Sequence, residues 1–306
     1  MRQTLHFSNA SEQTKILRII ALIPAYAIIS FLSVAFPDAA TYLESWTNVY
    51  ESVALASFFL LLVVYLVPVL EKQDAFFDRL PMKDRKGHET GGGSLAWFQR
   101  RWICVFQYVI FAPFVAIATD ITQGAGIYCL SSSKPHFAHI WLQVIRFVSV
   151  AVAFLNILAV YTRLRSDLHA HKPFLKLVGI KGIVFLSFVQ NVIFTILRSA
   201  DALKPTSTLS YNDITFGLPN LLLCIEMLLF SFLHLVAFCS TPYYVSARAS
   251  YEGGTLGVKA IAAACNPVDI MSGVVQAIGY LTGSKHSGSA ARYQGVGMEP
   301  LRVFVQ

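Results

Sequence analysis

Residues 50–70 read YESVALASFFLLLVVYLVPVL, and after Glu51 this stretch contains no charged side chain. An α-helix needs about 20 apolar residues to cross the ~30 Å hydrocarbon core of a bilayer. Backbone N–H and C=O groups find no water at that depth, so a spanning segment of this kind must be helical. The stretch therefore predicts a transmembrane helix.

Five more apolar runs of similar length accompany it. They are residues 16–36, 103–121, 138–162, 174–198 and 216–239. Of the 306 residues, 55% are hydrophobic and only 13% are charged, against about 25% charged residues in an ordinary soluble domain. Strand-like alternation is absent, which argues against a barrel. We predict an all-α fold, a polytopic membrane helix bundle of about six transmembrane helices over residues 16–239, with the lipid bilayer as its main partner.

Basic residues alternate between the two sides of these predicted spans. Twenty of the 24 Lys and Arg lie before or at the start of the first span, in the stretches 71–102 and 163–181, or after residue 240. Cytoplasmic connections carry an excess of Lys and Arg. An N-terminal segment 1–15 and a tail 240–306 are therefore both predicted to be cytoplasmic. The net charge of +7 is then a topology signal, and we expect no nucleic-acid partner.

The tail contains one further helical pattern. Residues 266–282 read NPVDIMSGVVQAIGYLT, in which Asn266-Pro267 is typical of a helix start. Apolar residues then follow at helical spacing, namely Val268, Met271, Val274, Val275, Ile278 and Leu281. We expect an amphipathic helix that lies on the membrane or against the bundle. From residue 283 the Gly/Ser-rich composition predicts disorder.

Polar side chains within the spans are the best functional clues, because an ionisable group at a helix centre costs at least ~2.5–3.5 kcal/mol in a bilayer. Glu226 lies near the middle of the last span, with Asn220 six residues before it and His234 eight residues after it. Its carboxyl could carry a proton, hold a cationic group or form a structural hydrogen bond between helices. We expect Glu226 and His234 to share roughly one helix face.

Arg146 lies inside the fourth span, where it could pair with an acid, bind an anionic substrate or reach the outer interface. Glu51 opens the second predicted span, and the simplest interpretation of an acid at a helix start is a cap. Amides within membranes commonly bond across helices. The hypothesis for a substrate path therefore combines Gln107, Arg146, Asn156, Gln190 and Glu226, with Glu51 and His234 beside them.

No catalytic motif is visible in the chain. The G-x-S-x-G, H-E-x-x-H, P-loop and G-x-G-x-x-G patterns are absent. The five cysteines form no C-x-x-C pair, and His169-Ala170-His171 alone is weak evidence for a metal. We therefore expect no enzyme, cofactor or metal site. Glu226 with His234 is the sole candidate pair for an intramembrane enzyme.

Five stretches together resemble one family. They are RIIALIPAYAIISFLSVAFPD (18–38), VYESVALASFFLLLVVYL (49–66), FQYVIFAPFVAI (106–117), KPFLKLVGIKGIVFLSFVQ (172–190) and NLLLCIEMLLFSFLHLVAF (220–238). In this order, over roughly residues 13–245, they resemble the organic solute transporter alpha subunit and transmembrane protein 184 superfamily. The chain looks like a divergent, fungal-like member.

The resemblance implies a seven-helix bundle with a cytoplasmic C-terminus, and facilitated transport of steroid-like and other amphipathic organic solutes. It also implies a small single-span beta subunit or a second copy of the chain as partner, and a vacuolar, endomembrane or plasma-membrane location. Glu51, Lys181, Gln190 and Glu226 fall on recurring polar positions of the family. The alternative to a transporter or transporter subunit is a signalling or scaffold protein of an endomembrane, acting through its cytoplasmic loop and tail.

The chain departs from the family pattern in three places. The family's first helix would precede residue 13 and is missing. Val189 stands where a tryptophan is expected, and Leu233-His234-Leu235-Val236 replaces a His-His-Tyr stretch. A missing helix could remove one wall of a transport path.

Overall fold

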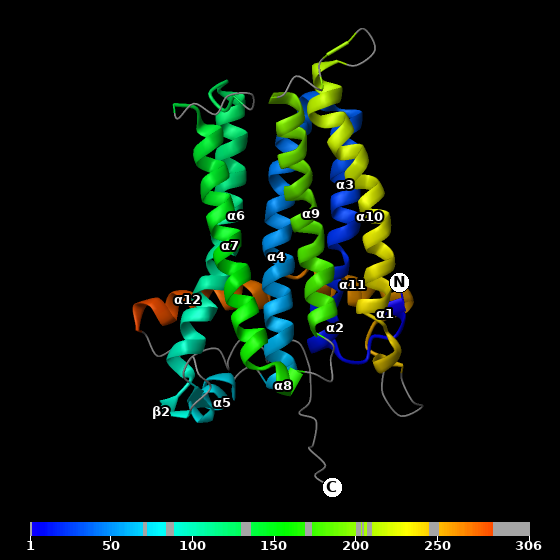
Figure 1. Ribbon diagram of the computed structural model, residues 1–306. Helices are drawn as coiled ribbons and strands as arrows, with labels where there is room; N and C mark the ends of the chain where they lie inside the picture. Colours follow the sequence, from blue (N-terminus) through cyan, green and yellow to red (C-terminus); the bar gives the residue numbers. More distant parts are fainter. Residues whose placement is uncertain are drawn as a thin grey trace.

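The protein is a bundle of long helices with a pair of helices laid across one side (Figure 1). The computed structural model describes residues 2–69, 72–83, 89–129, 136–168, 173–199, 203, 205–206, 210–244 and 251–283, with only part of the side chains in the helix Pro173–Ser199. The bundle helices are α2 (Ala10–Ile20) with α3 (Leu22–Ala35), α4 (Ala40–Leu66), α6 (Leu95–Gly124), α7 (Ala138–Arg163), α9 (Pro173–Ser199) and α10 (Leu218–Ala237). The predicted all-α membrane bundle is confirmed.

Short elements connect these helices. They are α1 (Arg2–Leu5), α5 (Gln73–Arg79), α8 (Arg165–Leu168) and a π-helical turn, Asp213–Gly217, that leads into α10. Two short strands, β1 (Pro81–Lys83) and β2 (Glu89–Gly93), pair antiparallel between α5 and α6. Neither strand was predicted.

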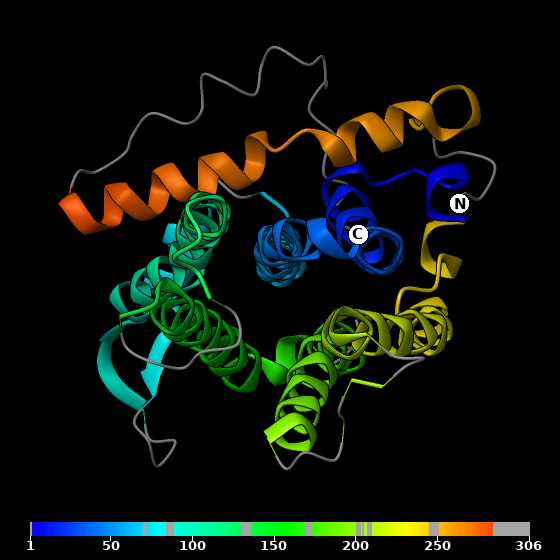
Figure 2. The same cartoon turned by 90° about the horizontal axis from the view of Figure 1, so that it is seen from above.

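Helix α4 is the central helix of the bundle, and Figure 2 places it within the ring of the others. It packs against α2, α3 and α6, and every residue from Ala54 to Val64 is buried. A helix segment that is apolar on all sides is typical of a protein core or a membrane span, and here it fills the core of the bundle. It ends at Leu66 with Val67 extended, because Pro68 disfavours the helical conformation in the residue before it.

Helix α4 is also longer than the apolar run that predicted it. It begins at Ala40, ten residues before the predicted start of the span at residue 50. At the other end, the helix stops at Leu66, whereas the predicted span continued to residue 70. Glu51 is therefore in the fourth turn of the helix and is not a helix-start cap, which corrects the simplest interpretation of this acid.

Helices α6 and α7 are antiparallel neighbours whose register is fixed by three polar pairs. Arg163 donates to the Ser94 hydroxyl at 2.6 Å, and Arg101 donates to the Asn156 side-chain oxygen at 2.6 Å. At the third level the Gln107 side-chain oxygen accepts from a hydroxyl of α7. Helix α6 begins at Leu95, so Arg100 and Arg101 lie on a helix and not in the connection 71–102 where sequence analysis placed them.

Among the described residues, six helical segments are long and apolar enough to cross a membrane. They are Ala10–Ala35, Pro37–Leu66, Leu95–Gly124, Ala138–Arg163, Asp213–Ala237 and Thr255–Thr282. The last of these consists mainly of two helices, α11 (Val258–Cys265) and α12 (Val268–Thr282), which run across the axis of the bundle (Figures 1 and 2). Helix α9, whose 27 residues are also strongly apolar, stands along the bundle axis and packs against α10.

Helix α12 packs against the bundle, which is one of the two positions that the sequence left open. The side formed by Ile270, Gly273, Val274 and Ala277 is buried, and the helix packs against α6. Most of the predicted apolar stripe is exposed instead, including Met271, Val275, Ile278 and Leu281. An exposed apolar side of this kind is suited to contact with lipid. Helix α11 was not predicted.

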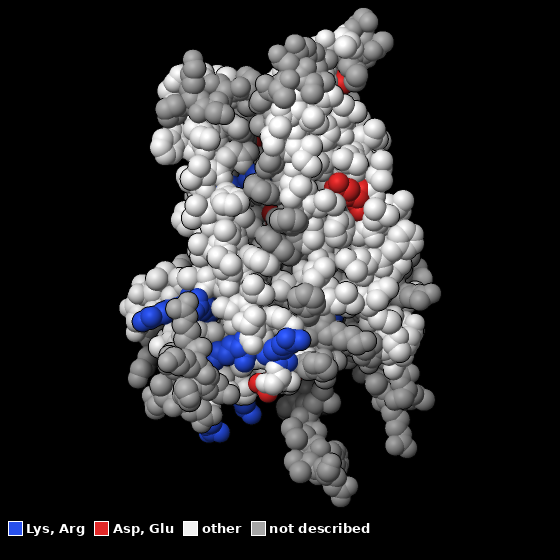
Figure 3. Space-filling model, viewed as in Figure 1, with Lys and Arg blue, Asp and Glu red and all other residues white. Residues whose placement is uncertain are grey.

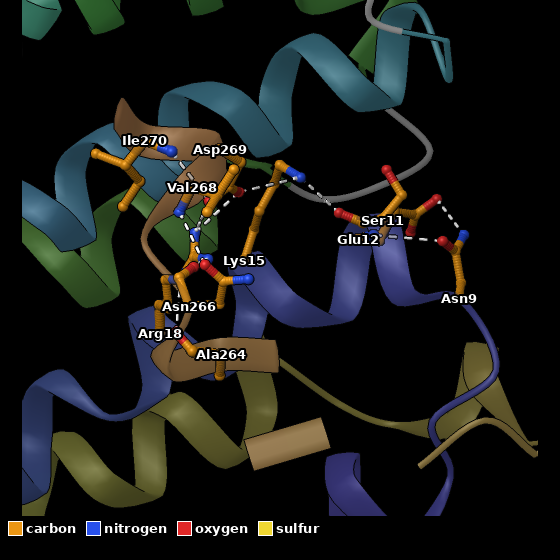
Figure 4. A network of polar contacts seen from close by, with 10 residues as sticks. All are labelled: Asn9, Ser11, Glu12, Lys15, Arg18, Ala264, Asn266, Val268, Asp269 and Ile270. Atoms are coloured by element: carbon orange, nitrogen blue, oxygen red, sulfur yellow. Dashed lines mark hydrogen bonds and ion pairs between the residues drawn. The ribbon is translucent and has the colours of Figure 1, made fainter. Parts of the chain in front are cut away.

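A network around Arg18 attaches this helix pair to α2 (Figure 4). The Arg18 guanidinium donates to the carbonyl oxygens of Ala264 and Asn266 and forms an ion pair with Asp269 at 2.8 Å. Lys15 lies 3.8 Å from the same carboxylate. Arg18 thus satisfies carbonyl groups at the end of α11 and the acid in the first turn of α12.

Gly273 lies at a tight contact between α12 and α6. The Trp102 indole N–H donates to the Gly273 carbonyl at 2.8 Å, and a Cβ built on Gly273 would lie 2.2 Å from Cζ of Phe106. We expect Gly273→Ala to destabilise the protein by about 1–3 kcal/mol through overpacking. The measurement is the apparent Tm of the purified protein in detergent, with Ser272→Ala on the same helix as control. Equal Tm values for the two variants would contradict this packing.

Candidate functional site

The first turns of α4 carry polar side chains on one face. Glu44, Asn48 and Glu51 are separated by four and three residues, which places them above one another on a helix. Their partners come from four other helices. We call the assembly the polar layer: Glu44, Ser45, Asn48 and Glu51 of α4, with Tyr26 of α3, Tyr108 and Asp120 of α6, Arg146 of α7 and Asn220 of α10.

Glu51 is bracketed by two phenol groups. The Tyr26 hydroxyl donates to one of its carboxylate oxygens, and the Tyr108 hydroxyl donates to the other at 3.1 Å. All three side chains are buried. Hydrogen bonds accepted on both oxygens stabilise a buried carboxylate. The carboxyl group therefore joins α3, α4 and α6 at one point.

Arg146 faces the same part of α4. Its Nη1 donates to the Asn48 side-chain oxygen at 2.9 Å, and its Nη2 donates to the Gln143 side-chain oxygen at 2.6 Å. Among the described residues, no carboxylate oxygen lies within the 4.0 Å limit of an ion pair from this guanidinium. Neutral amides thus form the hydrogen bonds that orient the cation, while the Glu44 carboxylate lies close enough to attract it electrostatically. Of the roles considered for Arg146, an acid partner is not found in this part of the chain.

Two further carboxylates complete the polar layer. The Asn220 amide donates to Glu44 at 2.7 Å. Asp120 accepts from the Ser45 hydroxyl at 2.9 Å and from the Trp46 indole at 3.0 Å. Three carboxylates therefore share the layer with one guanidinium. Such a group of charges in a membrane protein is a functional-site hypothesis by default.

Tyr128 lies in the connection between α6 and α7, at the same end of the bundle. Burial raises the pKa of its hydroxyl to about 12, while the nearby Arg146 lowers this pKa and Glu44 raises it by smaller amounts. The phenol is therefore neutral at physiological pH. It is a buried aromatic group close enough to interact electrostatically with Arg146 and Glu44.

The remaining predicted amides form structural pairs. The Gln107 amide donates to the Ser149 carbonyl at 2.8 Å, and its oxygen accepts from the Ser149 hydroxyl at 2.6 Å. Asn156 accepts from Arg101. Gln190 on α9 donates to the carbonyl of Pro219 at 2.6 Å. Each contact joins two neighbouring helices, and among the described residues none of the three amides is hydrogen-bonded to the polar layer. The side chain of Lys181 lies outside the described residues.

Glu226 and His234 are not brought together. Eight residues of helix separate them by about 12 Å along the axis. The His234 Nδ1 donates to the Phe230 carbonyl at 3.1 Å. Glu226 Oε2 and His234 Nε2 are buried, and neither finds a hydrogen-bond partner among the described residues. The geometry therefore gives no support to a catalytic pair.

Metal ligands are likewise not clustered in the part of the chain that the structure describes, where no group of three or more His, Cys, Asp or Glu could hold an ion. All five cysteines are free thiols. His169 and His171 lie outside the described residues. Among the described residues, hydrogen-bonding and charged side chains are thus the groups with which this bundle could bind a ligand.

Comparison with known proteins identifies the family of this chain. The family model described as organic solute transporter Ostalpha matches residues 1–243, which include every bundle helix and the whole polar layer. The chain belongs to the organic solute transporter Ostalpha family. This is a transporter family and not an enzyme class, and with its apolar helices the chain is an integral multi-pass membrane protein.

Several relatives of this Ostalpha family member are known. A transmembrane protein 184 homologue of Dictyostelium discoideum is 28% identical over 262 residues, which cover 80% of this chain and 49% of the relative. Protein LAZ1 of Arabidopsis thaliana is 26% identical over 257 residues, or 78% of this chain and 53% of the relative. Vacuole membrane protein hfl11 of Schizosaccharomyces pombe is 25% identical over 247 residues, or 78% and 57%. The chain spans about half the length of these relatives. No solved structure matches it.

Sequence reasoning found Glu51 and Arg146 but missed their neighbours. It missed Tyr26, Glu44, Asn48, Tyr108, Asp120 and Asn220 as members of one site. The signal for the α4 residues was present in the spacing of Glu44, Asn48 and Glu51, but residues 37–49 were interpreted as a connection. The phenols and the distant acid could be found only from the helix packing.

Proposed function

We propose that this Ostalpha family member is a transporter, or the membrane subunit of one, for amphipathic organic solutes that combine an apolar, steroid-like body with an anionic group. Family membership and the multi-pass bundle support transport. The observation that supports an anionic group is the Arg146 guanidinium, which neutral amides hold and which forms no ion pair within 4.0 Å of a carboxylate among the described residues.

Different residues of the polar layer would bind different groups of the solute. Arg146 offers a planar fork of donors suited to a sulfate or carboxylate. Asn48 and Gln143 orient it, so little side-chain entropy is lost on binding. Glu51, with its phenol partners, offers acceptors for a solute hydroxyl. The three carboxylates nearby oppose the anion, which favours release after binding.

The orientation follows from charge. On the face drawn in Figure 3, Lys and Arg gather near the lower end of the bundle, and the stretch above them is almost free of basic residues. We infer that this lower end faces the cytoplasm, with both termini and the tail 240–306 on that side. One relative is named as a vacuole membrane protein, which favours a vacuolar or endomembrane location over the plasma membrane. A small single-span subunit or a second copy of the chain would complete the assembly.

Flux measurement tests the proposal. The purified chain is reconstituted into liposomes, and uptake of a labelled steroid sulfate is compared with uptake into protein-free liposomes. Saturable uptake that depends on the protein supports transport by this chain. Uptake equal to that of protein-free liposomes would contradict transport by the chain alone.

Glu226→Gln gives this assay a residue-level prediction. Glu226 Oε2 is buried on α10 and has no hydrogen-bond partner among the described residues, so its carboxyl group remains available to a solute or a proton. We expect the amide, which cannot ionise, to lower the initial uptake rate about tenfold, equivalent to about 1.4 kcal/mol. Ser231→Ala on the same helix is the control. An unchanged rate would remove Glu226 from the path.

A further inference from the structure

Helices α11 and α12 lie across the bundle, although together they are long enough to cross a membrane. The segment Thr255–Thr282, which contains both helices, has the length and apolar composition of a membrane span. The two helices nevertheless run across the axis of the bundle (Figures 1 and 2). An apolar segment in this orientation buries only one side against the protein, so its other apolar side needs a partner of its own.

Three contacts hold α12 in the crosswise orientation. They lie at its start, its middle and its end, and each is made with a different element of the bundle. The pairs are Asp269 with Arg18 of α2 at 2.8 Å, Gly273 with Trp102 of α6 at 2.8 Å, and Tyr280 with Asp74 of α5 at 2.7 Å. Because both ends of α12 are fixed, its remaining sides have defined directions.

The side chains of α12 divide into three groups around the helix. The buried group, which packs on the bundle, consists of Ile270, Gly273, Val274 and Ala277. The polar group, spaced by three or four residues, consists of Asp269, Ser272, Gln276 and Tyr280. The outer apolar group is between 49% and 67% exposed and consists of Val268, Met271, Val275, Ile278 and Leu281. At 3.6 residues per turn, the polar and outer apolar groups point about 140° apart.

Three such sides match three different surroundings. The buried side contacts protein, and the polar side is suited to water and lipid headgroups. The outer apolar side is suited to hydrocarbon, as in helices that lie in the plane of a membrane interface. A soluble partner protein would need the outer apolar side to point into water, whereas the polar side already takes that direction.

The level of α12 along the bundle matches one edge of the hydrocarbon layer. Trp102, which contacts α12, is 22 residues from the end of α6 at Gly124, or about 33 Å along the axis. Arg18, which also contacts α12, is 17 residues from the end of α3 at Ala35, or about 26 Å. These two lengths bracket the ~30 Å thickness of the hydrocarbon core. With the far ends of α3 and α6 at one boundary of this core, α12 lies at the other.

We infer that α11 and α12 are embedded in the plane of the lipid leaflet at this end of the bundle, with the outer apolar side of α12 in contact with acyl chains. Helix α11 continues the same surface with Val258 and Ile261, which are 63% and 53% exposed. Because α12 is fixed to α2, α5 and α6, the helix pair sets the depth of the whole bundle in the membrane. This role does not depend on transport, since neither helix contributes a residue to the polar layer.

Spin labels on the full chain in phosphatidylcholine nanodiscs test the occupant of the outer apolar side. The background carries Cys239→Ser and Cys265→Ser, because these two exposed thiols would also react, and its own labelled signal is subtracted. Nitroxides are attached at Ile278→Cys and, as the matched control on the polar side, at Gln276→Cys. Oxygen concentrates in hydrocarbon, whereas a neutral nickel chelate stays in water. We expect the ratio of oxygen to nickel collisions to be at least about tenfold higher at position 278 than at 276, since a polar complex is excluded from hydrocarbon.

Two results at position 278 would overturn the inference. Nickel collisions equal to those at position 276 would place the outer apolar side in water. Protection from both reagents would mean that protein, such as a second copy of the chain, covers it. Position 278 is exposed, so its label replaces no packed side chain, and an unchanged apparent Tm checks that the variant is folded.

Labels at Val268→Cys and Leu281→Cys separate the in-plane orientation from a membrane crossing. The two positions are thirteen residues apart, or about 20 Å along the helix. We expect equal depths at both positions in the same nanodiscs. A depth difference close to the full helix length would show that Thr255–Thr282 crosses the bilayer and would overturn the inference.

Discussion

Asp269→Asn is expected to release α11 and α12 from the bundle and to lower the stability of the protein by about 3 kcal/mol. Arg18 and Lys15, with side chains only 5% exposed, share this carboxylate. Removing one partner of a buried ion pair costs about 3–5 kcal/mol, because it leaves the other charge uncompensated. The lower value applies here because Asp269 is 18% exposed and Arg18 retains its carbonyl acceptors.

Two measurements check this result. The apparent Tm in detergent should fall, and trypsin should cleave at Lys259 in α11 faster than in the wild type. Asp167→Asn, on the short helix α8, is the control and should behave as the wild type. Lys15→Met combined with Asp269→Asn should recover part of the loss, because it removes one of the two stranded cations. A full-length protein with wild-type Tm and cleavage rate would show that the ion pair does not hold the helices.

Arg146→Gln is expected to have the largest effect on activity. Hydrogen bonds to a charged group contribute about 1.5–3 kcal/mol, so the concentration of steroid sulfate at half-maximal uptake should rise about 10–100-fold. Arg146→Lys should recover only part of this loss, since an ammonium group lacks the planar fork of donors. Arg165→Gln, on α8 just beyond the other end of α7, is the matched control for charge. Equal uptake curves for Arg146→Gln and the wild type would contradict anion recognition by this residue.

The bundle could be predicted because few backbone structures can span a lipid bilayer. A run such as residues 50–70 cannot leave its backbone groups unpaired in hydrocarbon, so apolar length and composition decide both the class and the approximate number of helices. The α12 helix was predictable for a similar reason, since its apolar residues recur at helical spacing. Its orientation was not, because residues such as Gly273 and Met271 are compatible with either the protein or lipid.

The polar layer was harder to predict because the first turns of α4, which carry much of it, are only moderately apolar. Hydropathy marks the part of α4 that lies in hydrocarbon, and Glu44 and Asn48 precede that part. Their role depends on which helix comes opposite, as with Arg146 from α7 and Asn220 from α10. Arg100 and Arg101 were also predicted to lie in a connection, because charged residues next to an apolar run are normally assigned to the segment between two spans. Contacts of this kind are set by packing and are not visible in the periodicity of a single helix.

Equilibrium binding of a steroid sulfate and its unconjugated parent to the protein in phosphatidylcholine nanodiscs is the most direct measurement. The two solutes share the apolar body and differ in the anionic group. If the guanidinium of Arg146 recognises that group, the wild type binds the sulfate more tightly than the parent, and Arg146→Gln binds both with similar affinity. A preference for the sulfate that survives in Arg146→Gln, or is absent in the wild type, would contradict this account.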